Sequence, residues 1–435
     1  MLNQVLPLSF IVGTRFFGLF IVLPVLSLYA LQLKDANDFL VGFLVGIYAL
    51  TQMILQMPFG ILSDKIGRKK TMLIGLIIFI IGSLVCSFAN NIYTMLLGRM
   101  LQGAGAIGAV ATAMISDFIT EENRGKAMAI MGSFIGLSFA ASMVISPLMS
   151  AKWGLSSLFD LSAALSFLCI ILLYTVVPKE NKITHENKKT PFFHFIKEKN
   201  LILMNLTNFM QKMLMSIAFL SIPILLVTHL GFDANKLWII YTISMIAGFI
   251  AMGFAGNLGE KKGLAKQILL LGIGFFILSY ILFAFYNSIE LFIIAIIIFF
   301  IGFNLHEPIM QSCASKFCKV HEKGAALGLF NAFGYGGSFV GGMVGGIFLH
   351  LDALNILAIV LVVLAIFWFI ALFFLKNPSE FKNLYLPLET PLNFTTFSQN
   401  LGIIDIYKNS KNLVIKFDSK LTNKEVLQNQ LQKNI

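Results

Sequence analysis

The sequence predicts an all-α polytopic membrane protein with about twelve transmembrane helices in two six-helix halves, followed by a small soluble α+β domain. Composition, run length and charge placement carry this prediction. Hydrophobic residues make up 57% of the 435 positions and charged residues 12%, whereas a soluble domain is nearer a quarter charged. The apolar runs can cross the ~30 Å hydrocarbon core as helices, which satisfy their own backbone hydrogen bonds, and they lack the alternation of barrel strands.

Twelve apolar ranges are separated by short loops whose positive charges alternate in number. Counted together with the first two residues of the range that follows, the loops after even-numbered ranges carry 18 lysines and arginines, and those after odd-numbered ranges carry three. Positive loops stay in the cytoplasm, so both termini are predicted to be cytoplasmic. The net charge of +11 therefore reflects topology rather than a nucleic-acid partner. The predicted spans are 5–30, 39–62, 71–89, 93–117, 125–149, 158–178, 201–229, 235–258, 265–286, 290–314, 323–350 and 353–375.

A polar segment rich in lysine, asparagine and glutamate divides the ranges six and six. The predicted domains are an N-terminal bundle over 1–178, a cytoplasmic linker over 179–200, a C-terminal bundle over 201–375 and a soluble domain over 384–435. The end of the linker is apolar and basic, which predicts a helix along the membrane surface. An internal repeat supports two halves, as in transporters built from parallel repeats. Its copies are Gly60-Ile-Leu-Ser-Asp64-Lys-Ile-Gly67-Arg68 and Gly256-Asn-Leu-Gly-Glu260-Lys-Lys-Gly263.

The soluble domain has a pattern typical of a small βαββα, ferredoxin-like fold. Thr422 is expected to cap its last helix, which is predicted to run to Leu431. Regulation, self-association and binding of a partner protein are alternatives to a plain stabilising tail. Strands are predicted over 384–388, 403–408 and 413–418, with a helix over 396–400.

Ionisable side chains inside the predicted spans cost about 2.5–3.5 kcal/mol each at a helix centre, so they mark candidate functional positions. Arg15, Arg99 and Lys212 are cations that could contact substrate or a carboxylate on another helix. Glu307 is a candidate proton carrier, because burial and a nearby cation shift carboxylate protonation in opposite directions. The alternative is a permanent ion pair that holds helices together. His306 lies about 100° around the helix from Glu307 and is interpreted as structural.

Polar side chains form a stripe on the seventh predicted helix at positions i, i+3, i+6 and i+7. Lipid would penalise such a stripe, so it is predicted to face a wet path, with helix–helix contact as the alternative. Gln52 and Gln56 share a face of the second predicted helix in the same way. The stripe consists of Asn205, Asn208, Gln211 and Lys212.

No motif predicts a cofactor, a metal ion or catalysis. Gly103-Ala-Gly105-Ala-Ile-Gly108 matches a dinucleotide-binding pattern, but it lies within a membrane helix with no strand before it and is interpreted as helix packing. No nucleotide-binding P-loop is present, and the four cysteines with His321 match no strong metal pattern. Glycine ladders for close helix approach are predicted at Gly337, Gly341 and Gly345, with Gly342 and Gly346.

The chain resembles the major facilitator superfamily over residues 1–375. The loop from Gly60 to Lys69 is similar to the family signature between the second and third spans, and Arg99-Met-Leu-Gln102 is similar to its fourth-helix motif. The resemblance extends to a drug-efflux-type branch with a βαββα appendage. The segments that support this branch are Thr14–Gly18, Phe303-Asn304 with Glu307, and Val414–Asn423.

This resemblance implies a charged cytoplasmic gate that is closed in the outward-open state, with Asp117 pairing with the loop. It also implies that Arg99 contributes to proton coupling or orients the fourth helix. In the fifth helix Pro147 follows Ser146 rather than the glycine of the exporter motif, so import stays open. The implied gate residues are Gly60, Asp64, Gly67, Arg68 and Asp117.

The leading hypothesis is a proton-coupled secondary transporter in a bacterial cytoplasmic (inner) membrane, exporting small organic or drug-like compounds by alternating access. Glu307 and Arg99 are the candidate proton-coupling residues. Uptake of an anionic metabolite is an alternative, because cations outnumber carboxylates in the spans. A membrane sensor or scaffold acting through the soluble domain is another. The candidate substrate path is Arg15, Gln52, Gln56, Gln102, Asn208, Gln211, Lys212 and Asn304.

Overall fold

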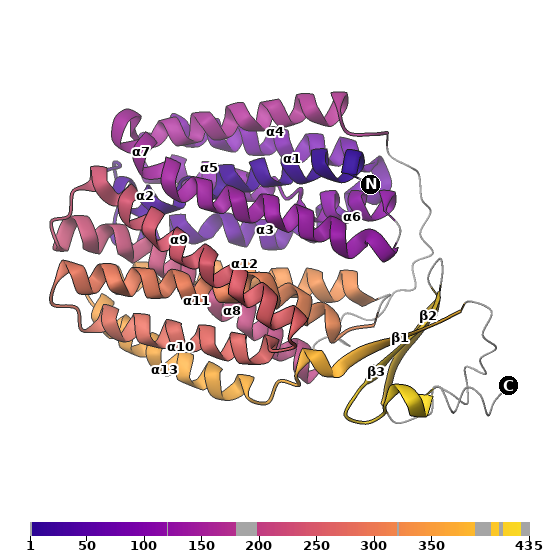
Figure 1. Ribbon diagram of the computed structural model, residues 1–435. Helices are drawn as coiled ribbons and strands as arrows, with labels where there is room; N and C mark the ends of the chain where they lie inside the picture. The colour runs from indigo at the N-terminus through magenta and orange to yellow at the C-terminus, as the bar shows by residue number, and fades with distance from the viewer. Residues whose placement is uncertain are drawn as a thin grey trace.

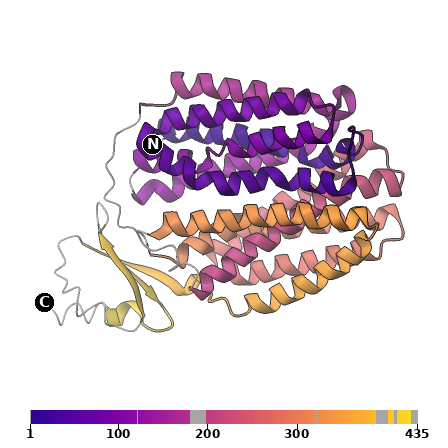
Figure 2. The ribbon, with the colours of Figure 1, turned by 180° about the vertical axis from the view of Figure 1, so that it is seen from behind.

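The computed structural model is a bundle of long helices in two groups, with a small sheet at one end (Figure 1). The groups follow one another in the sequence, and the view from behind shows the same division (Figure 2). The predicted linker helix and the predicted helix over 396–400 lie outside the described residues. The structure describes residues 2–119, 121–179, 198–319, 322–387, 402–408 and 412–427, except the side chains of 121–125, 260 and 261.

Helix makes up most of the described part of every predicted span, with short breaks inside the first and the fourth. The helices of the first group are α1 (Leu2–Phe20), α2 (Leu23–Ala30), α3 (Asp38–Ile66), α4 (Arg68–Ser87), α5 (Ile92–Ala104), α6 (Gly108–Phe118) and α7 (Glu121–Thr175). The helices of the second group are α8 (Lys199–Ile224), η2 (Leu225–His229), η3 (Ala234–Lys236), α9 (Leu237–Gly256), η4 (Asn257–Lys261), α10 (Ala265–Ala284), α11 (Ile289–Lys316), α12 (Lys323–His350) and α13 (Leu354–Leu372).

Ten segments within the described residues are long and apolar enough to cross a membrane. The predicted count of twelve differs at two places. The predicted fourth span is divided into the shorter helices α5 and α6, and the predicted fifth and sixth spans are merged in α7. The merged helix contains Gly154, whose φ of 78° is non-helical, so α7 consists of two helices that meet there.

The break between α5 and α6 corrects the prediction that the glycine motif lies within one unbroken helix. At the break, the Ala106 amide donates to the Ala104 carbonyl at 2.8 Å, so the i to i−4 pattern is interrupted. The predicted packing role is confirmed, because a Cβ at Gly103 would collide with the Tyr48 carbonyl of α3 and one at Gly105 with Gly75 of α4.

Helix α12 packs between α8 and α3 through two glycine faces, as the ladders predict. Gly337 and Gly341 lie against the backbone of α8, at Phe209 and Met213. On the other face, Gly342 and Gly346 lie against the backbone of α3 around Gly42 and Gly46. The absence of side chains lets these backbones approach closely, which is how small residues tighten membrane helices. We call the contact of α3 with α12 the glycine seam.

The glycine seam opens toward the end of the molecule that carries the sheet. Gly60 lies fourteen residues after Gly46 on α3, and Gly328 lies fourteen residues before Gly342 on α12, so each is on nearly the same helix face as its partner in the seam. A Cβ at Gly60 or Gly328 would meet no atom within 4 Å. The close backbone contact of the seam is therefore present at the far end and absent at these two positions near the sheet.

The C-terminal sheet has three strands in the order β1-β3-β2, with both outer strands antiparallel to β3. Leu384 and Ile406 both lie opposite Ile415, and Leu427 packs on the same small core. The last helix is capped by Asn423, whose Oδ1 accepts from the Val426 amide at 2.8 Å, so the predicted cap at Thr422 is wrong by one residue. The strands are β1 (Phe381–Pro387), β2 (Ile403–Lys408) and β3 (Asn412–Asp418), so the first starts three residues before its predicted start.

The sheet packs against the end of the second half and is not joined to it by the chain alone. The Lys416 ammonium on β3 donates to the Cys318 carbonyl, just after α11, at 2.8 Å. The Phe317 and Phe381 rings meet edge to face with centroids 5.2 Å apart. Burial lowers the pKa of Lys416 to about 8. These contacts fix the soluble domain to the end of the helix that carries Glu307.

Candidate transport site

Two arginines are fully buried in the first half. Arg15 on α1 and Arg99 on α5 both have zero exposure. The Arg15 Nη2 donates to the Gln52 Oε1 and to the Gln102 carbonyl, at 3.4 Å each. The Arg99 Nη1 donates to the Gln102 Oε1 at 2.7 Å. Gln102 therefore bridges the two guanidinium groups, and amides rather than carboxylates hold both.

Aromatic faces supply much of the remaining stabilisation of these cations. The Arg99 guanidinium lies 4.6 Å from the centre of the Tyr48 ring, and the Arg15 guanidinium lies 5.5 Å from that of Phe79. Such contacts are worth up to about 2 kcal/mol when desolvated. Two nitrogens of each guanidinium have no hydrogen-bond partner, and within the described residues neither group has an ion pair with a carboxylate. The first half thus holds two positive charges in a dry setting.

The buried cluster is hydrogen-bonded to helix α12 of the second half. The Gln52 Nε2 donates to the Tyr335 hydroxyl of α12 at 2.8 Å. Gln102 is also bonded within its own half, because its Nε2 donates to the Ser83 hydroxyl at 2.9 Å. Gln56, one turn from Gln52, is half-buried with its Oε1 unpartnered. When α12 moves relative to α3, the hydrogen bond between Gln52 and Tyr335 must therefore break, or the two side chains must move together to keep it.

The second half holds an ion pair near the middle of its helices. The Lys212 Nζ on α8 lies 2.6 Å from the Glu307 Oε1 on α11. The Gln211 Nε2 donates to the same oxygen at 3.1 Å. The side chains of Lys212 and Glu307 are 24% and 33% exposed, and Lys212 lies 4.9 Å from the centre of the Phe303 ring. Unlike the arginines, this pair is accessible to water.

The predicted polar stripe divides between helix contact and an accessible group. Asn208 is buried, and its Nδ2 donates to the Phe330 carbonyl of α12 at 2.7 Å, which is a helix–helix contact. Asn205 and Gln211 are also buried, and only Lys212 at the end of the stripe is partly exposed. Asn304 is buried and its Nδ2 donates to the Phe300 carbonyl of its own helix. In this conformation Lys212 is the one residue of the stripe that is partly exposed to water.

His306 points away from its neighbour Glu307. It is fully buried, with its Nε2 2.8 Å from the Leu269 carbonyl of α10. The rings of Phe276 and Trp368 meet it edge to face, with centroids 5.6 and 5.5 Å away. Its surroundings are those of a packed core residue.

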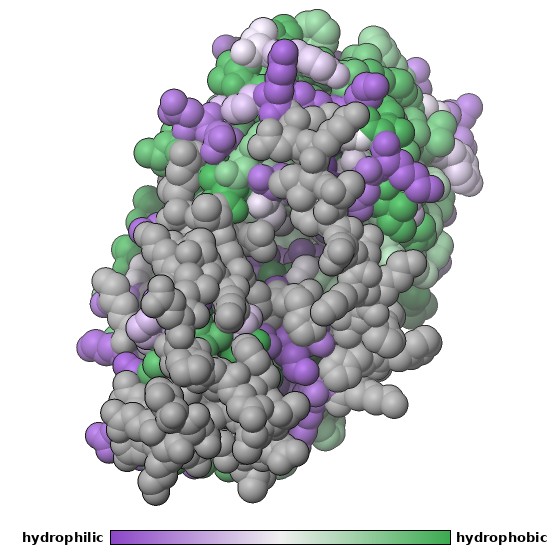
Figure 3. All heavy atoms as spheres, turned by 90° about the vertical axis from the view of Figure 1, so that its right-hand side faces the viewer, coloured by the Kyte–Doolittle hydropathy of each residue, from purple (hydrophilic) through white to green (hydrophobic). Residues whose placement is uncertain are grey.

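The predicted gate residues meet at the end of α3. Arg68 Nη1 lies 2.6 Å from Asp64 Oδ1, and Arg68 Nε lies 3.0 Å from Asp117 Oδ2, so Asp117 contacts the loop as expected. Gly67 adopts a φ of 101°, and Gly263 in the second copy adopts 72°. Both copies therefore turn through a left-handed glycine three residues after their acid. Hydrophilic side chains gather at this end of the molecule (Figure 3).

Sequence reasoning missed the aromatic partners of these charges. Three aromatic residues each contact a charged or amide side chain of the site that lies on another helix. They are Tyr335, Tyr48 and Phe303. Tyr335 stands between two glycines, Gly334 and Gly336, and a hydroxyl in a run of small residues is the signal that could have found it. Among the described residues no three of histidine, cysteine, aspartate and glutamate gather in a way that could hold a metal ion.

The two-group helical fold and its charged gate define a class of membrane transporter. The chain belongs to the Major Facilitator Superfamily, whose family model matches residues 8–233 and 201–398. It is therefore an integral membrane transporter and not an enzyme.

Individual relatives agree with this family. The chain is 32% identical over 435 residues to the inner membrane transport protein YajR of Escherichia coli (strain K12), covering 96% of this chain and 94% of the relative. It is 28% identical over 334 residues to the class B tetracycline resistance protein of Escherichia coli, covering 71% and 78%. The solved structure of the nucleoside transporter NupG superposes with a TM-score of 0.70 at 15% identity, covering 85% of this chain and 98% of that one, which is a likeness of fold.

Proposed function

We propose that this transporter couples proton movement to the export of small organic compounds. The observation that carries the proposal is the ion pair of Lys212 with Glu307, which joins α8 to α11 and is partly exposed. A proton on Glu307 would remove its negative charge and weaken its attraction for Lys212. Proton binding would thereby loosen one helix from another, which is what coupling a gradient to a conformational change requires.

Alternating access follows from the glycine seam. The lysine-rich loops support a cytoplasmic position for the sheet and both termini, in which the open end of the seam would face inward. We propose twelve crossings, with α5 and α6 forming one and the two parts of α7 forming one each. In the opposite state the Arg68 cluster with Asp64 and Asp117 would hold the cytoplasmic end closed. The C-terminal sheet is proposed to have the ferredoxin-like order of strands.

The names of two relatives support the substrate class and the location. The tetracycline resistance protein suggests small organic compounds as substrates, and YajR suggests a bacterial inner membrane. Within the proposed path, the Lys212 ammonium is partly exposed beside the Phe303 ring, and the Gln56 Oε1 has no hydrogen-bond partner. A site that combines polar groups with an aromatic ring favours amphipathic molecules. Arg99 and Gln102 would act indirectly, by orienting α5.

The proposed function is tested by replacing Glu307 with glutamine in protein reconstituted into liposomes. With an imposed pH gradient, the wild type is expected to accumulate radiolabelled tetracycline above its equilibrium level. Glu307→Gln should lose this accumulation by at least tenfold, because the side chain keeps its shape but no longer binds a proton. Exchange of labelled for unlabelled tetracycline at equal pH should remain.

The matched control is Glu290→Gln, which changes an exposed glutamate at the start of the same helix α11. It should accumulate tetracycline as the wild type does. Gradient-driven accumulation that survives in Glu307→Gln contradicts proton coupling through this residue. A wild type that neither exchanges nor accumulates tetracycline contradicts the proposed substrate class.

A second candidate function is uptake of an anionic metabolite. It is favoured by Arg15 and Arg99, whose buried guanidinium groups carry unpartnered nitrogens and no carboxylate within the described residues. An anionic substrate that reached them would supply the missing acceptors. Inhibition of tetracycline exchange by a panel of organic anions, and its loss in Arg15→Met, would distinguish uptake of anions from export of amphipathic molecules.

A further inference from the structure

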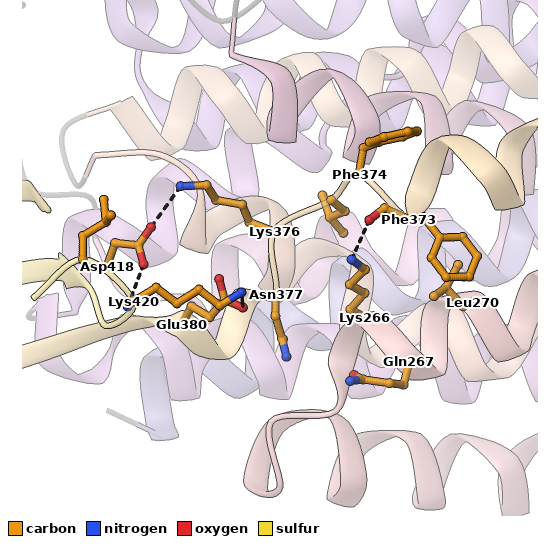
Figure 4. Close-up of a pocket in the computed structure, with 12 residues that line it drawn as sticks. Lys266, Gln267, Leu270, Phe373, Phe374, Lys376, Asn377, Glu380, Asp418 and Lys420 are labelled. Carbon is orange, nitrogen blue, oxygen red and sulfur yellow. Dashed lines mark hydrogen bonds and ion pairs between the residues drawn. The ribbon is translucent and has the colours of Figure 1, made fainter. Parts of the chain in front are cut away.

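A pocket of about 560 Å³ lies where the soluble domain meets the membrane helices (Figure 4). Its walls come from the start of α10, the end of α13, and the turn that follows β3. Its volume is in the range of small-molecule sites. By the topology proposed above, the pocket lies at the level of the cytoplasmic lipid headgroups.

The polar wall of the pocket carries more cations than carboxylates. Lys376 pairs with Asp418 at 3.0 Å, and Lys420 pairs with Glu380 at 2.8 Å. Lys266 has no carboxylate among the lining residues, and its Nζ donates to the Phe373 carbonyl at 2.7 Å. Because an ammonium has three N–H groups, Lys266 has donors left for an anion. The wall therefore presents one uncompensated positive charge.

The membrane-side wall is apolar and exposed. Phe373 and Phe374 at the end of α13 are 55% and 63% exposed, and Leu270 of α10 faces the same pocket. Lys199 at the start of α8 lies 5.1 Å from the centre of the Phe374 ring, which adds a cation at the rim. Exposed apolar side chains such as phenylalanine next to lysines suit the boundary between lipid headgroups and acyl chains. An occupant must therefore combine an anionic group with an apolar chain.

We propose that this pocket binds the phosphate of an anionic phospholipid, such as phosphatidylglycerol, from the cytoplasmic leaflet. The phosphate accepts from Lys266, and an acyl chain lies against Phe373 and Phe374. Basic pockets on the cytoplasmic side of membrane helices suit such headgroups. Because the turn after β3 forms the opposite wall, the bound lipid fastens the soluble domain to α10 and α13.

The test measures lipid binding to the full-length protein by native mass spectrometry with phosphatidylglycerol. Lys266→Gln should weaken binding about fivefold, the effect of one lysine near an anionic lipid surface. Gln267→Glu is a second variant, which adds a negative charge at an exposed lining residue whose side chain makes no hydrogen bond within the described part of the chain. It should weaken binding by a similar factor. The matched control is Lys126→Gln, an exposed lysine at the start of α7 in the other half.

Each outcome decides the proposal. Weaker binding in both pocket variants with unchanged binding in Lys126→Gln supports it. Equal binding in all of the variants, or equal binding of phosphatidylcholine, overturns it by indicating ordinary boundary lipid. If inorganic phosphate displaces phosphatidylglycerol at comparable concentration, the site takes a soluble anion and the lipid is overturned as its occupant. None of these readouts depends on proton coupling.

Discussion

The two halves of this transporter treat buried charge in opposite ways. In the first half, Arg15 and Arg99 are sealed from water, bridged by Gln102 and covered by aromatic rings. In the second half, Lys212 and Glu307 neutralise one another and remain a quarter to a third exposed. Fixed cations without access to water have no means of exchanging a proton. A carboxylate with access to water can exchange a proton with it, and a nearby cation stabilises its charged form.

The difference teaches that the position of a charge in a membrane span does not by itself identify its role. Each member of an ion pair stabilises the other, so losing either one leaves an uncompensated charge. An unpaired buried cation already carries that cost, so replacing it with an apolar side chain removes the cost. Stability measurements can therefore separate the two kinds of site without any knowledge of the substrate.

The largest effect is expected at the ion pair. Lys212→Met should lower the free energy of unfolding by about 2 kcal/mol, because Glu307 would lose its counter-ion while remaining two-thirds buried. Titration with sodium dodecyl sulfate in mixed micelles measures this free energy. The double variant Lys212→Met with Glu307→Gln should recover most of the loss. A double variant no more stable than the single one would mean that the pair is not coupled.

A change of opposite sign is expected in the first half. Arg99→Met should raise the free energy of unfolding by about 1.5 kcal/mol, because a partly unsatisfied buried charge is replaced by an apolar side chain. Loss of a donor to Gln102 offsets part of the gain. The same titration measures it, with the exposed Lys152→Met as control. Destabilisation as large as that of Lys212→Met would end the contrast between the halves.

The smallest effect concerns Lys416, a buried cation outside the membrane. Burial lowers its pKa from 10.5 to about 8 in the docked domain. Between these two values the undocked domain binds more protons, so docking should strengthen as pH rises, by about 1 kcal/mol between pH 7 and 9. Burial also raises the pKa of Cys318, which keeps that thiol neutral over this range.

Spin labels on β3 and on the end of α11 would measure the docked fraction at each pH. Lys416→Met should remove the pH dependence while the neutral side chain stays buried. The charged groups that also act on Lys416 are Lys316, Lys323 and Asp405. Docking that weakens as pH rises would contradict the assignment to Lys416.

Much of the fold could be predicted from the sequence because its determinants are local. Apolar run length, loop charge and the glycine spacing of α12 each depend on residues close together in the chain. The same is true of the gate loop, where Asp64 and Arg68 are one turn apart. The contact with Asp117 was expected from the family resemblance and is present, whereas its role as a gate stays a prediction.

What could not be predicted depends on packing between distant segments. The break after Ala104 arises where glycines of α5 and the segment after it press on α3 and α4, which no local pattern reveals. The sealing of Arg15 depends on Gln52 and on aromatic rings from other helices. The sequence could place Lys212 and Glu307 in spans but could not say that they face one another.

The glycine seam has a consequence for the speed and reversibility of closure. At Gly42 and Gly346 two backbones touch directly, so no rotamers are frozen when the halves meet and none need to be released when they part. Contact at this seam therefore costs little side-chain entropy, unlike contact between interdigitated side chains. If the halves alternate as proposed, a free-energy change as small as the gain or loss of one ion pair would decide which side of the membrane the proposed path faces.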